Sequence, residues 1–370
     1  MAQRKKKVSM PLLSQVLKSV GDRLRGPLAI ILGSPGEVLP FLADLPRMPV
    51  TCYEMDLYPA QRLREELEAI GLEADVAAAP DLWDLPPEFQ TVVYPAPKGG
   101  ERELKIDMVE QAHHILRPHG TFIVATPFQS DQFFPRLLKK TFGRVHMPNT
   151  GQLNTVLWCT REGDRPRRRH EVTFQVRGEE GHPSLRFVSR PGVFTYGRMD
   201  EGARALLEAA VLDSGENVLD VGCGCGTNGI MAAQRTGRDS SITFVDSNLR
   251  ALALTDLNAQ ANGLVAYKTV ATATMEGLPV KAFDVALANP PYFAHAAIAK
   301  LFIQRSRALL KPGGRFYLVT KQPKELAPLV VESFGETDAV MHRGYTILAA
   351  RVAGPEKAGS LFRIATDIFE

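Results

Sequence analysis

Long hydrophobic runs are missing from this chain of 370 residues, and none approaches the roughly 18 residues of a membrane-spanning helix. The N-terminus, residues 1–7, is basic, but no long apolar segment with a small-residue cleavage site follows it, so the sequence predicts no secretory signal peptide. Cysteine is scarce, with four residues in all, which argues against a disulfide framework and indicates reduced thiols. We therefore expect a cytoplasmic protein without a membrane role.

Net charge is also small, and a formal value of +3 does not by itself identify a nucleic-acid-binding protein. The basic residues are nevertheless clustered, at residues 4–7 and again at Arg165–His170. Such clusters can neutralise the phosphates of RNA or DNA. The alternative is a solvated tail and a solvated linker, and charge alone does not separate the two.

The second half of the chain carries a pattern that the first half repeats in weaker form. Expected strands at 217–222, 241–246 and 283–288 alternate with helices, which predicts an α/β domain with a largely parallel sheet. Each matching segment of the first half lies upstream of its counterpart in the second half. The separation is 189 residues at the glycine turn, 190 at the next strand, 193 at the third strand and 194 at the turn before the fourth. Because this offset drifts slowly in one direction, the pattern indicates a tandem duplication.

The two copies differ at the positions where chemistry is expected. An offset of 193 residues places Ala96–Gly99 opposite Asn289–Tyr292, so the first copy lacks the Asn-Pro-Pro-Tyr sequence of the second. Its glycine turn, Gly33–Gly36, has fewer glycines and contains a proline, which removes an N–H donor. We therefore expect the N-terminal copy to have lost catalysis and to serve packing, substrate binding or both.

The glycine turn of the second copy, Asp220–Thr227, follows an expected strand and opens an expected helix. Glycine is needed there because the chain must turn with positive φ and let a ligand touch the backbone. A dinucleotide fingerprint has the spacing G-x-G-x-x-G. Here the spacing is G-x-G-x-G, and Asp220 lies two residues before the first glycine, where it can meet the ammonium group of an amino-acid moiety. These features favour S-adenosylmethionine over NAD.

Two further segments are candidates for the cofactor site. Asp246 ends the next expected strand, 20 residues beyond Gly226, where a carboxylate can accept hydrogen bonds from both hydroxyls of a ribose. The segment Arg190–Asp200 has aromatic residues between glycines and can fold over a cofactor; the alternative is a domain-entry turn with core aromatics. No metal is expected, because the Cys-x-Cys of the glycine turn has no second cluster to complete a zinc site.

Asn289-Pro290-Pro291-Tyr292 ends the apolar segment 283–288 and is suited to methylation of a planar amine. The lone pair of such an amine is delocalised and must be turned toward the methyl donor. The side-chain oxygen of Asn289 and a backbone carbonyl near Pro290 can accept its two N–H groups, and proline rigidity fixes that carbonyl. Tyr292 offers a face for stacking a flat group. The rate then comes from positioning and electrostatic fit, without a strong general base.

In these residues the sequence resembles the bacterial ribosomal RNA guanine-N2 methyltransferases, which pair a degenerate N-terminal methyltransferase-like domain with an active C-terminal one. Pro191–Phe194, Asp220–Gly226, Asp246, Asn289–Tyr292 and the duplication carry the resemblance. It implies that the C-terminal domain binds S-adenosylmethionine and methylates a guanine amine, while the N-terminal domain helps to hold RNA. The chain departs from the family at Thr272–Thr274, where Asn or Asp is usual near the adenine.

The expected fold is α/β, with two tandem Rossmann-like class I S-adenosylmethionine-dependent methyltransferase domains, the N-terminal one degenerate. The expected divisions are residues 1–162 for the degenerate domain, 163–189 for a basic linker and domain entry, and 190–370 for the catalytic domain. The predicted cofactor-binding residues are Asp220, Gly222, Cys223, Gly224, Gly226, Asp246, Ser247, Thr272, Thr274, Asn289 and Phe194, and the predicted catalytic residues are Asn289, Pro290, Pro291 and Tyr292.

The resemblance implies methyl transfer to a guanine N2 amine, with ribosomal RNA or a ribosomal subunit as the partner. We expect the protein to be a monomer. Asn-Pro-Pro-Tyr is also shared by enzymes that methylate adenine N6 or a protein glutamine amide, so these acceptors and small molecules stay open. A different class stays open too, a non-catalytic RNA-binding or ribosome-assembly factor, although the intact second copy argues against it.

Overall fold

The computed structural model describes residues 10–148, 155–178, 181–290, 296–354 and 360–363. The chain divides into two compact units, Met1–His170 and Glu171–Glu370. This division falls inside the segment 163–189 that we expected as a linker, so that residues 163–170 belong to the N-terminal unit and residues 171–189 begin the C-terminal one. No helix within the described ranges is long and apolar enough to cross a membrane.

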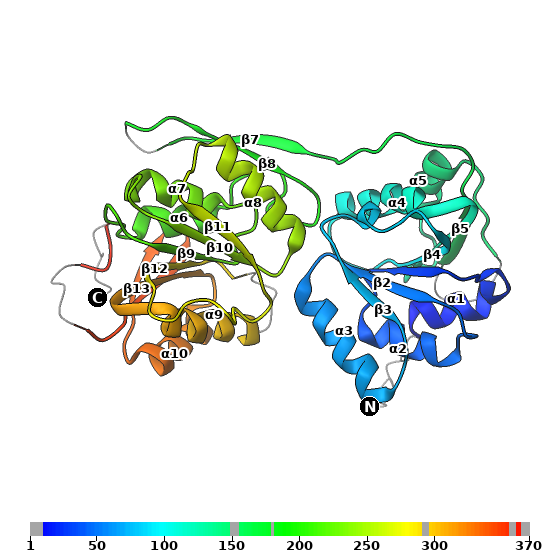
Figure 1. The fold of residues 1–370 in the computed structure, drawn as a ribbon, viewed down its shortest axis with the longest axis horizontal. Helices are drawn as coiled ribbons and strands as arrows, with labels where there is room; N and C mark the ends of the chain where they lie inside the picture. Colours follow the sequence, from blue (N-terminus) through cyan, green and yellow to red (C-terminus); the bar gives the residue numbers. More distant parts are fainter. Residues whose placement is uncertain (1–9, 149–154, 179–180, 291–295, 355–359, 364–370) are drawn as a thin grey trace, which may run out of the picture. The chain divides into compact units, whose positions relative to one another are not determined.

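The N-terminal unit is built on a six-stranded sheet with the order β3-β2-β1-β4-β5-β6, in which only β6 is antiparallel to its neighbour. Alternate residues of β1 enter two separate hydrophobic cores, one on each face, because helices cover both faces of the sheet. The elements are α1 (Leu12–Val20), β1 (Leu28–Ile31), α2 (Pro35–Asp44), β2 (Val50–Glu54), α3 (Leu57–Ile70), β3 (Asp75–Ala78), β4 (Phe89–Pro95), α4 (Arg102–Ile115), β5 (Leu116–Thr126), α5 (Phe133–Phe142) and β6 (Thr155–Thr160) (Figure 1).

The C-terminal unit has a seven-stranded sheet with the order β11-β10-β9-β12-β13-β15-β14, closed at one edge by the antiparallel strands β15 and β14. A separate hairpin of β7 and β8 packs against α8, beside which Figure 1 draws it. The elements are β7 (Val172–Val176), β8 (Leu185–Ser189), α6 (Glu201–Ala209), β9 (Val218–Val221), α7 (Thr227–Thr236), β10 (Ile242–Asp246), α8 (Leu249–Ala261), β11 (Tyr267–Ala271), β12 (Phe283–Ala288), α9 (Ala296–Leu309), β13 (Leu310–Thr320), α10 (Pro323–Phe334), β14 (Asp338–His342) and β15 (Tyr345–Arg351).

The shared order of the five parallel strands confirms the expected fold class of two tandem α/β domains. Each sheet places its first strand between the second and the fourth, with the third strand at the edge. The strands β1 and β9 are buried on both faces of their sheets. This explains why their sequences are mainly apolar, as is usual for parallel strands that are covered by helices on both faces.

Strand pairing determines which residues of the two units are equivalent. The Leu32 N–H donates to the Tyr53 carbonyl at 2.9 Å, as the Gly222 N–H donates to the Val245 carbonyl at 2.8 Å. The equivalent pairs, with the N-terminal unit first, are Ile30 and Asp220, Leu32 and Gly222, Glu54 and Asp246, and Pro95 and Asn289. This register replaces the equivalents taken from the sequence offset, which were Gly33, Asp56 and Ala96.

Candidate active site

The predicted site residues of the C-terminal unit come together at the carboxyl edge of its sheet. Gly222 follows β9, Asp246 ends β10, Thr272 follows β11 and Asn289 follows β12. Because β10, β9 and β12 are neighbours and parallel, their carboxyl ends lie at one edge. In open α/β sheets, ligands bind in the crevice outside these ends.

The glycine loop after β9 has an open backbone at its centre. Gly222, Gly224 and Gly226 all have positive φ, at 68°, 57° and 87°. A Cβ atom on Gly222 would lie 3.0 Å from the Phe302 ring, and one on Gly226 would lie 3.0 Å from the Thr255 methyl, whereas a Cβ atom on Gly224 would meet no atom within 4 Å. The outer glycines are therefore needed for packing, and the middle one leaves space in which a ligand can approach the backbone.

Helix α8 holds this loop in place. The Thr255 hydroxyl donates to the Gly224 carbonyl at 2.8 Å, and the Asn258 amide donates to the Cys225 carbonyl at 2.9 Å. Asn258 is fully buried and also bonds Val188 of β8 in both directions, at 2.8 and 2.9 Å. The hairpin, the helix and the loop thus form one rigid support.

Asp246 lies directly against the loop. Its Oδ2 accepts the Gly224 N–H at 2.9 Å, and its Oδ1 accepts the Asn248 N–H at 2.9 Å. Ser247, which lies between Asp246 and Asn248 in the sequence, is half-buried. This carboxylate is where we expected the ribose of the cofactor, and the open position at Gly224 beside it fits that group.

Asp220 is fully buried beneath the loop. Its Oδ2 accepts the Gly229 N–H of α7 at 2.8 Å. Burial raises its pKa to about 7, although the Gly229 N–H and the Asn228 side chain oppose the shift, and the negative charge of Asp246 adds to it. A carboxylate that costs free energy to keep charged is suited to receiving a cation such as the ammonium group of S-adenosylmethionine.

The raised pKa of Asp220 predicts a pH-dependent stability. The folded protein holds this proton more tightly than the unfolded chain, so the stabilisation is complete below the unfolded pKa and is lost as the pH rises through about 7. We expect the cofactor-free wild type to lose melting temperature relative to the permanently neutral Asp220→Asn between about pH 5 and pH 8, as measured by calorimetry. A difference that is constant over this range would contradict the prediction.

The segment 190–200 is fastened to the start of α8, next to Asp246. The Asn248 amide donates to the Gly192 carbonyl at 2.9 Å, and the Arg250 guanidinium, fully buried, donates to the Pro191 carbonyl at 2.6 Å. Val193 packs into a small core with Cys225. The segment therefore lies at the predicted cofactor edge, with Phe194 44% exposed on its surface.

Asn289 presents a buried amide whose oxygen is unsatisfied. Its Nδ2 donates to Asp200 Oδ2 at 2.9 Å, whereas its Oδ1 accepts no hydrogen bond from any residue that the structure describes. Asp200 is also the N-cap of α6, since the same Oδ2 accepts the Ala203 N–H at 2.8 Å. The hydrogen bond that Asn289 donates to Asp200 fixes which way the amide points, and it leaves the oxygen available to accept an N–H group.

Asp200 ends the candidate segment 190–200, but it was not among the individual residues predicted for the site, and its contact with Asn289 was not predicted. We expect Asp200→Ala to lower methyl transfer about tenfold, because the Asn289 amide loses its orienting partner. Asp200→Asn keeps an oxygen that can accept both bonds and should retain most of the rate. Steady-state kinetics with both variants, at equal folded fraction by melting curves, checks this. If Asp200→Ala transferred the methyl group at the wild-type rate, Asp200 would serve only as the cap of α6. Loss of that cap would then lower the stability by roughly 1 kcal/mol.

The other predicted residues either lie outside the described ranges or make only local contacts. Pro290 is buried directly after Asn289, and Pro291 and Tyr292 lie outside the described residues. The Thr272 hydroxyl accepts the Thr274 and Met275 N–H groups at 3.2 and 3.0 Å, so that it stabilises its own turn. Their roles in binding stay predictions.

Cys223 and Cys225 are buried inside the glycine turn. Burial raises the pKa of Cys225 to about 12 and that of Cys223 well above its usual range, so both stay thiols at neutral pH. Cys223 Sγ lies 3.5 Å from the Thr255 hydroxyl. Within the described ranges, no group of three or more His, Cys, Asp or Glu residues could hold a metal ion.

The equivalent edge of the N-terminal unit is filled by its own side chains. A Cβ atom on Gly33 would lie 2.8 Å from the Val38 side chain and 2.9 Å from that of Ile30, the residue equivalent to Asp220. Glu54 keeps an acid at the end of β2, but burial raises its pKa to about 8. Among the described residues of this unit, Pro95 occupies the position of Asn289, and Gly33 leaves no open space for a ligand.

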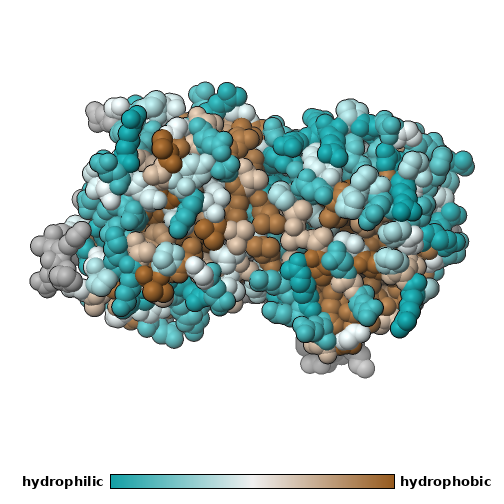
Figure 2. Space-filling model, in the orientation of Figure 1, coloured by the Kyte–Doolittle hydropathy of each residue, from teal (hydrophilic) through white to brown (hydrophobic). Residues whose placement is uncertain are grey.

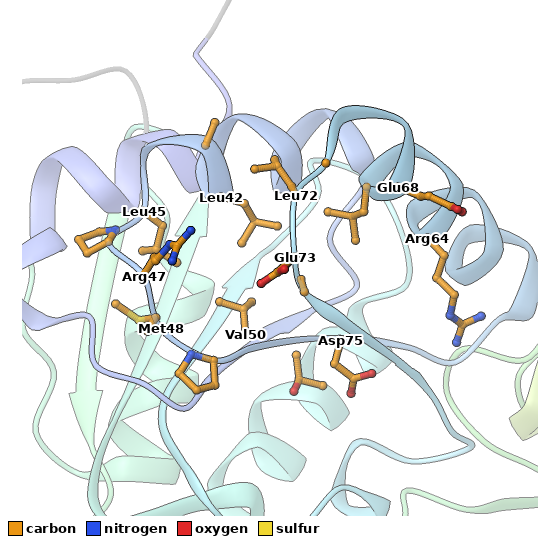
Figure 3. Close-up of a pocket in the computed structure, with 17 residues that line it drawn as sticks. Leu42, Leu45, Arg47, Met48, Val50, Arg64, Glu68, Leu72, Glu73 and Asp75 are labelled. Carbon is orange, nitrogen blue, oxygen red and sulfur yellow. The ribbon is translucent and has the colours of Figure 1, made fainter.

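A cavity of about 1140 Å³ does occur in the N-terminal unit, at the other edge of its sheet (Figure 3). Leu42, Val50 and Leu72 line it, together with charged residues such as Glu73. Val50 and Asp75 are the first residues of β2 and β3. The cavity therefore lies at the amino ends of the strands, opposite the edge where α/β sheets bind their cofactors.

Comparison with known proteins agrees with this geometry. Residues 184–349 match the family described as the methyltransferase small domain. The protein YbxB of Bacillus subtilis, itself uncharacterised, is 30% identical over 48% of this chain and 90% of its own length. Ribosomal RNA small subunit methyltransferase C of Chromohalobacter salexigens is 35% identical over 41% of this chain and 46% of its own length, so the match spans about half of that relative.

A solved structure matches nearly the whole chain. The 16S rRNA N2 G1207 methyltransferase (RsmC) of T. thermophilus, in complex with AdoMet and guanosine, has 25% sequence identity and a TM-score of 0.73, with 94% of this chain and 93% of that chain covered. The family model and this match to a solved structure assign the chain to the S-adenosylmethionine-dependent methyltransferases. The open position at Gly224 and the Asn289 oxygen, which has no partner among the described residues, fit that class. Within that class, the chain belongs to the methyltransferase small domain family.

Proposed function

We propose that this protein transfers a methyl group from S-adenosylmethionine to the exocyclic N2 amine of a guanine in small-subunit ribosomal RNA. The observation that carries the proposal is the Asn289 amide, which is held by Asp200 and leaves its Oδ1 without a partner among the described residues. The named activity of the T. thermophilus RsmC, which resembles this chain over both units, supports guanine N2 as the acceptor.

The cofactor, when bound, supplies an electrophilic methyl group on a positive sulfonium. The Gly222–Gly226 loop and Asp246 would hold it, with Asp220 beneath the loop as a negative charge for its ammonium group. These residues fit because the position at Gly224 is open and the loop is already held by Thr255 and Asn258. Little reorganisation is then needed on binding.

The acceptor amine would be oriented by Asn289 and Pro290. Asn289 Oδ1 accepts one N–H of the amine, and the Pro290 carbonyl accepts the other, which turns the nitrogen lone pair out of these bonds and toward the methyl donor. Asp200 keeps the Asn289 amide in the orientation with its oxygen outward. After transfer the nitrogen loses a proton readily, so no strong base is required at this edge.

The proposal extends to where and how the protein acts. We expect a cytoplasmic monomer whose substrate is ribosomal RNA, either naked or within a ribosomal subunit. The C-terminal unit carries the chemistry, and the N-terminal unit, filled at the equivalent edge, contributes binding.

The test is a methylation assay with labelled S-adenosylmethionine and small-subunit ribosomal RNA from a strain that lacks the gene. Nucleoside mass spectrometry should then find N2-methylguanosine. If N6-methyladenosine appeared instead, the acceptor would be adenine N6 and the guanine assignment would be wrong. A failure of the purified protein to bind S-adenosylmethionine saturably in calorimetry would leave the non-catalytic RNA-binding class.

A further inference from the structure

The N-terminal unit has a cleft of about 580 Å³ between α4 and α5, which we name the α4–α5 cleft. It is lined by Arg102, Ile106, Glu110, Gln132, Phe133, Arg136, Leu137, Lys140, Arg168 and His170. We infer that this cleft binds the sugar-phosphate backbone of the RNA substrate. The inference rests on the proposed function for the identity of the RNA and adds to it the surface that holds the RNA.

The charge of the cleft is strongly positive. Four Lys or Arg side chains line it against the single acid Glu110, which makes a net charge of +3 with histidine counted as neutral, as large as the formal charge of the whole chain. A hydrogen bond from His170 lowers the pKa of Glu110, so its carboxylate is already ionised and occupied. Arg136, Lys140 and Arg168 are exposed, and the charges of Arg168 and Lys140 also help to lower the pKa of Glu110. Four cations against one ionised acid leave an excess of positive charge that phosphate groups can neutralise.

The two ends of the basic cluster Arg165–His170 are anchored on this unit, while residues 166–169 between them are exposed. The Arg165 guanidinium donates to the Lys140 and Thr141 carbonyls at the end of α5, at 2.7 and 2.9 Å. At the other end, His170 Nε2 lies 2.7 Å from Glu110 Oε2 on α4. Arg168 lies between these two anchors and is thereby held over the cleft.

The floor of the cleft suits a nucleotide better than a second protein. Phe133 is half-buried there, and the Arg102 guanidinium lies 5.0 Å from the centre of its ring. An aromatic ring beside guanidinium groups can stack with a base or a ribose. Figure 2 shows mainly hydrophilic side chains in the part of the view where Figure 1 draws α5. Arg136 and Lys140, one helical turn apart on α5, follow one another along the cleft.

The test compares two pairs of neutral substitutions on and beside α5. Arg136→Gln with Lys140→Gln removes two cations that line the cleft, whereas Lys139→Gln with Arg144→Gln removes two exposed cations of the same region that do not line it. Gln keeps the helix propensity of these positions close to that of Arg and Lys. Binding of a fluorescein-labelled 20-nucleotide RNA hairpin is measured by anisotropy over a series of salt concentrations.

We expect the cleft pair to weaken RNA binding about tenfold or more near 100 mM salt. The slope of log affinity against log salt should fall by roughly 0.7–0.9 for each phosphate group that the variant no longer neutralises. The control pair should leave both quantities near those of the wild type. Equal affinity and slope for the two pairs would overturn the inference.

Two further measurements separate this inference from its alternatives. If the cleft pair loses binding to labelled polyglutamate but keeps its affinity for RNA, the surface serves an acidic protein and the inference is wrong. Calorimetry with S-adenosylmethionine should give the same affinity for all variants, because the cofactor residues belong to the other unit. A wild type that binds RNA through the cleft yet transfers no methyl group would refute the proposed function alone.

Discussion

Replacing Asn289 with Ala should lower the rate of methyl transfer by roughly 10²–10³-fold while the dissociation constant of S-adenosylmethionine changes by less than about threefold. The substitution removes the only side-chain oxygen at the end of β12 that the surrounding described residues leave unpaired. That oxygen is predicted to act on the acceptor amine, and the cofactor is held by the loop after β9 and by Asp246. Single-turnover transfer and cofactor calorimetry on the same preparation measure the two effects.

The effect of Asn289→Ala on transfer must be separated from its effect on folding. Asn289 is 8% exposed, and its loss also leaves Asp200 with one hydrogen bond fewer. A melting curve therefore accompanies each assay. Equal losses of cofactor affinity and transfer would mean that the side chain supports the site structurally and does not act on the acceptor amine.

Replacing Gly224 with Ala should raise the dissociation constant of S-adenosylmethionine by at least about tenfold. The new methyl group enters the open space beside the loop, because no protein atom lies within 4 Å of that position. A left-handed backbone also disfavours any side chain there, at a cost of roughly 1–2 kcal/mol. Calorimetry with the cofactor gives the affinity, and thermal unfolding gives the stability.

Gly263 supplies a matched control for Gly224. It too has a positive φ, of 75°, and a Cβ atom on it would meet nothing within 4 Å. It lines a cavity of about 610 Å³ beside the amino ends of β10 and β11, away from the carboxyl edge. Gly263→Ala should lose similar stability and keep the cofactor affinity. If both variants lost affinity equally, strain alone would account for the effect and the open space at Gly224 would have no role.

Much of this architecture can be predicted from the sequence because it depends on local patterns. The alternation of apolar strands and helices indicates two parallel sheets, and the order of glycines and acids places Gly222, Asp246 and Asn289 at strand ends. Strand ends of a parallel sheet meet at one edge, so the grouping of these residues follows once the fold is right.

Other features depend on contacts that no local pattern reveals. Asp200 and Asn289 are 89 residues apart in the sequence, and an acid before a helix predicts only a cap. The equivalents of the site residues in the first copy were displaced by one or two positions, because a glycine was matched to a glycine and an acid to an acid, whereas strand pairing places Leu32 and Glu54 at those positions. The packing of Arg165 and His170 onto α5 and α4 likewise arises from tertiary contacts within a segment that has the composition of a linker.

The left-handed backbone at Leu32 has a consequence for the N-terminal unit. Leucine is an unfavourable residue at a φ of 49°, yet Leu32 keeps the backbone bend and the hydrogen bond of its equivalent Gly222. The bend is thus present without a glycine, and Ile30 and Val38 fill the space beside it. Both side chains belong to the hydrophobic core of this unit, so we expect that no single substitution would open a cofactor site at this edge.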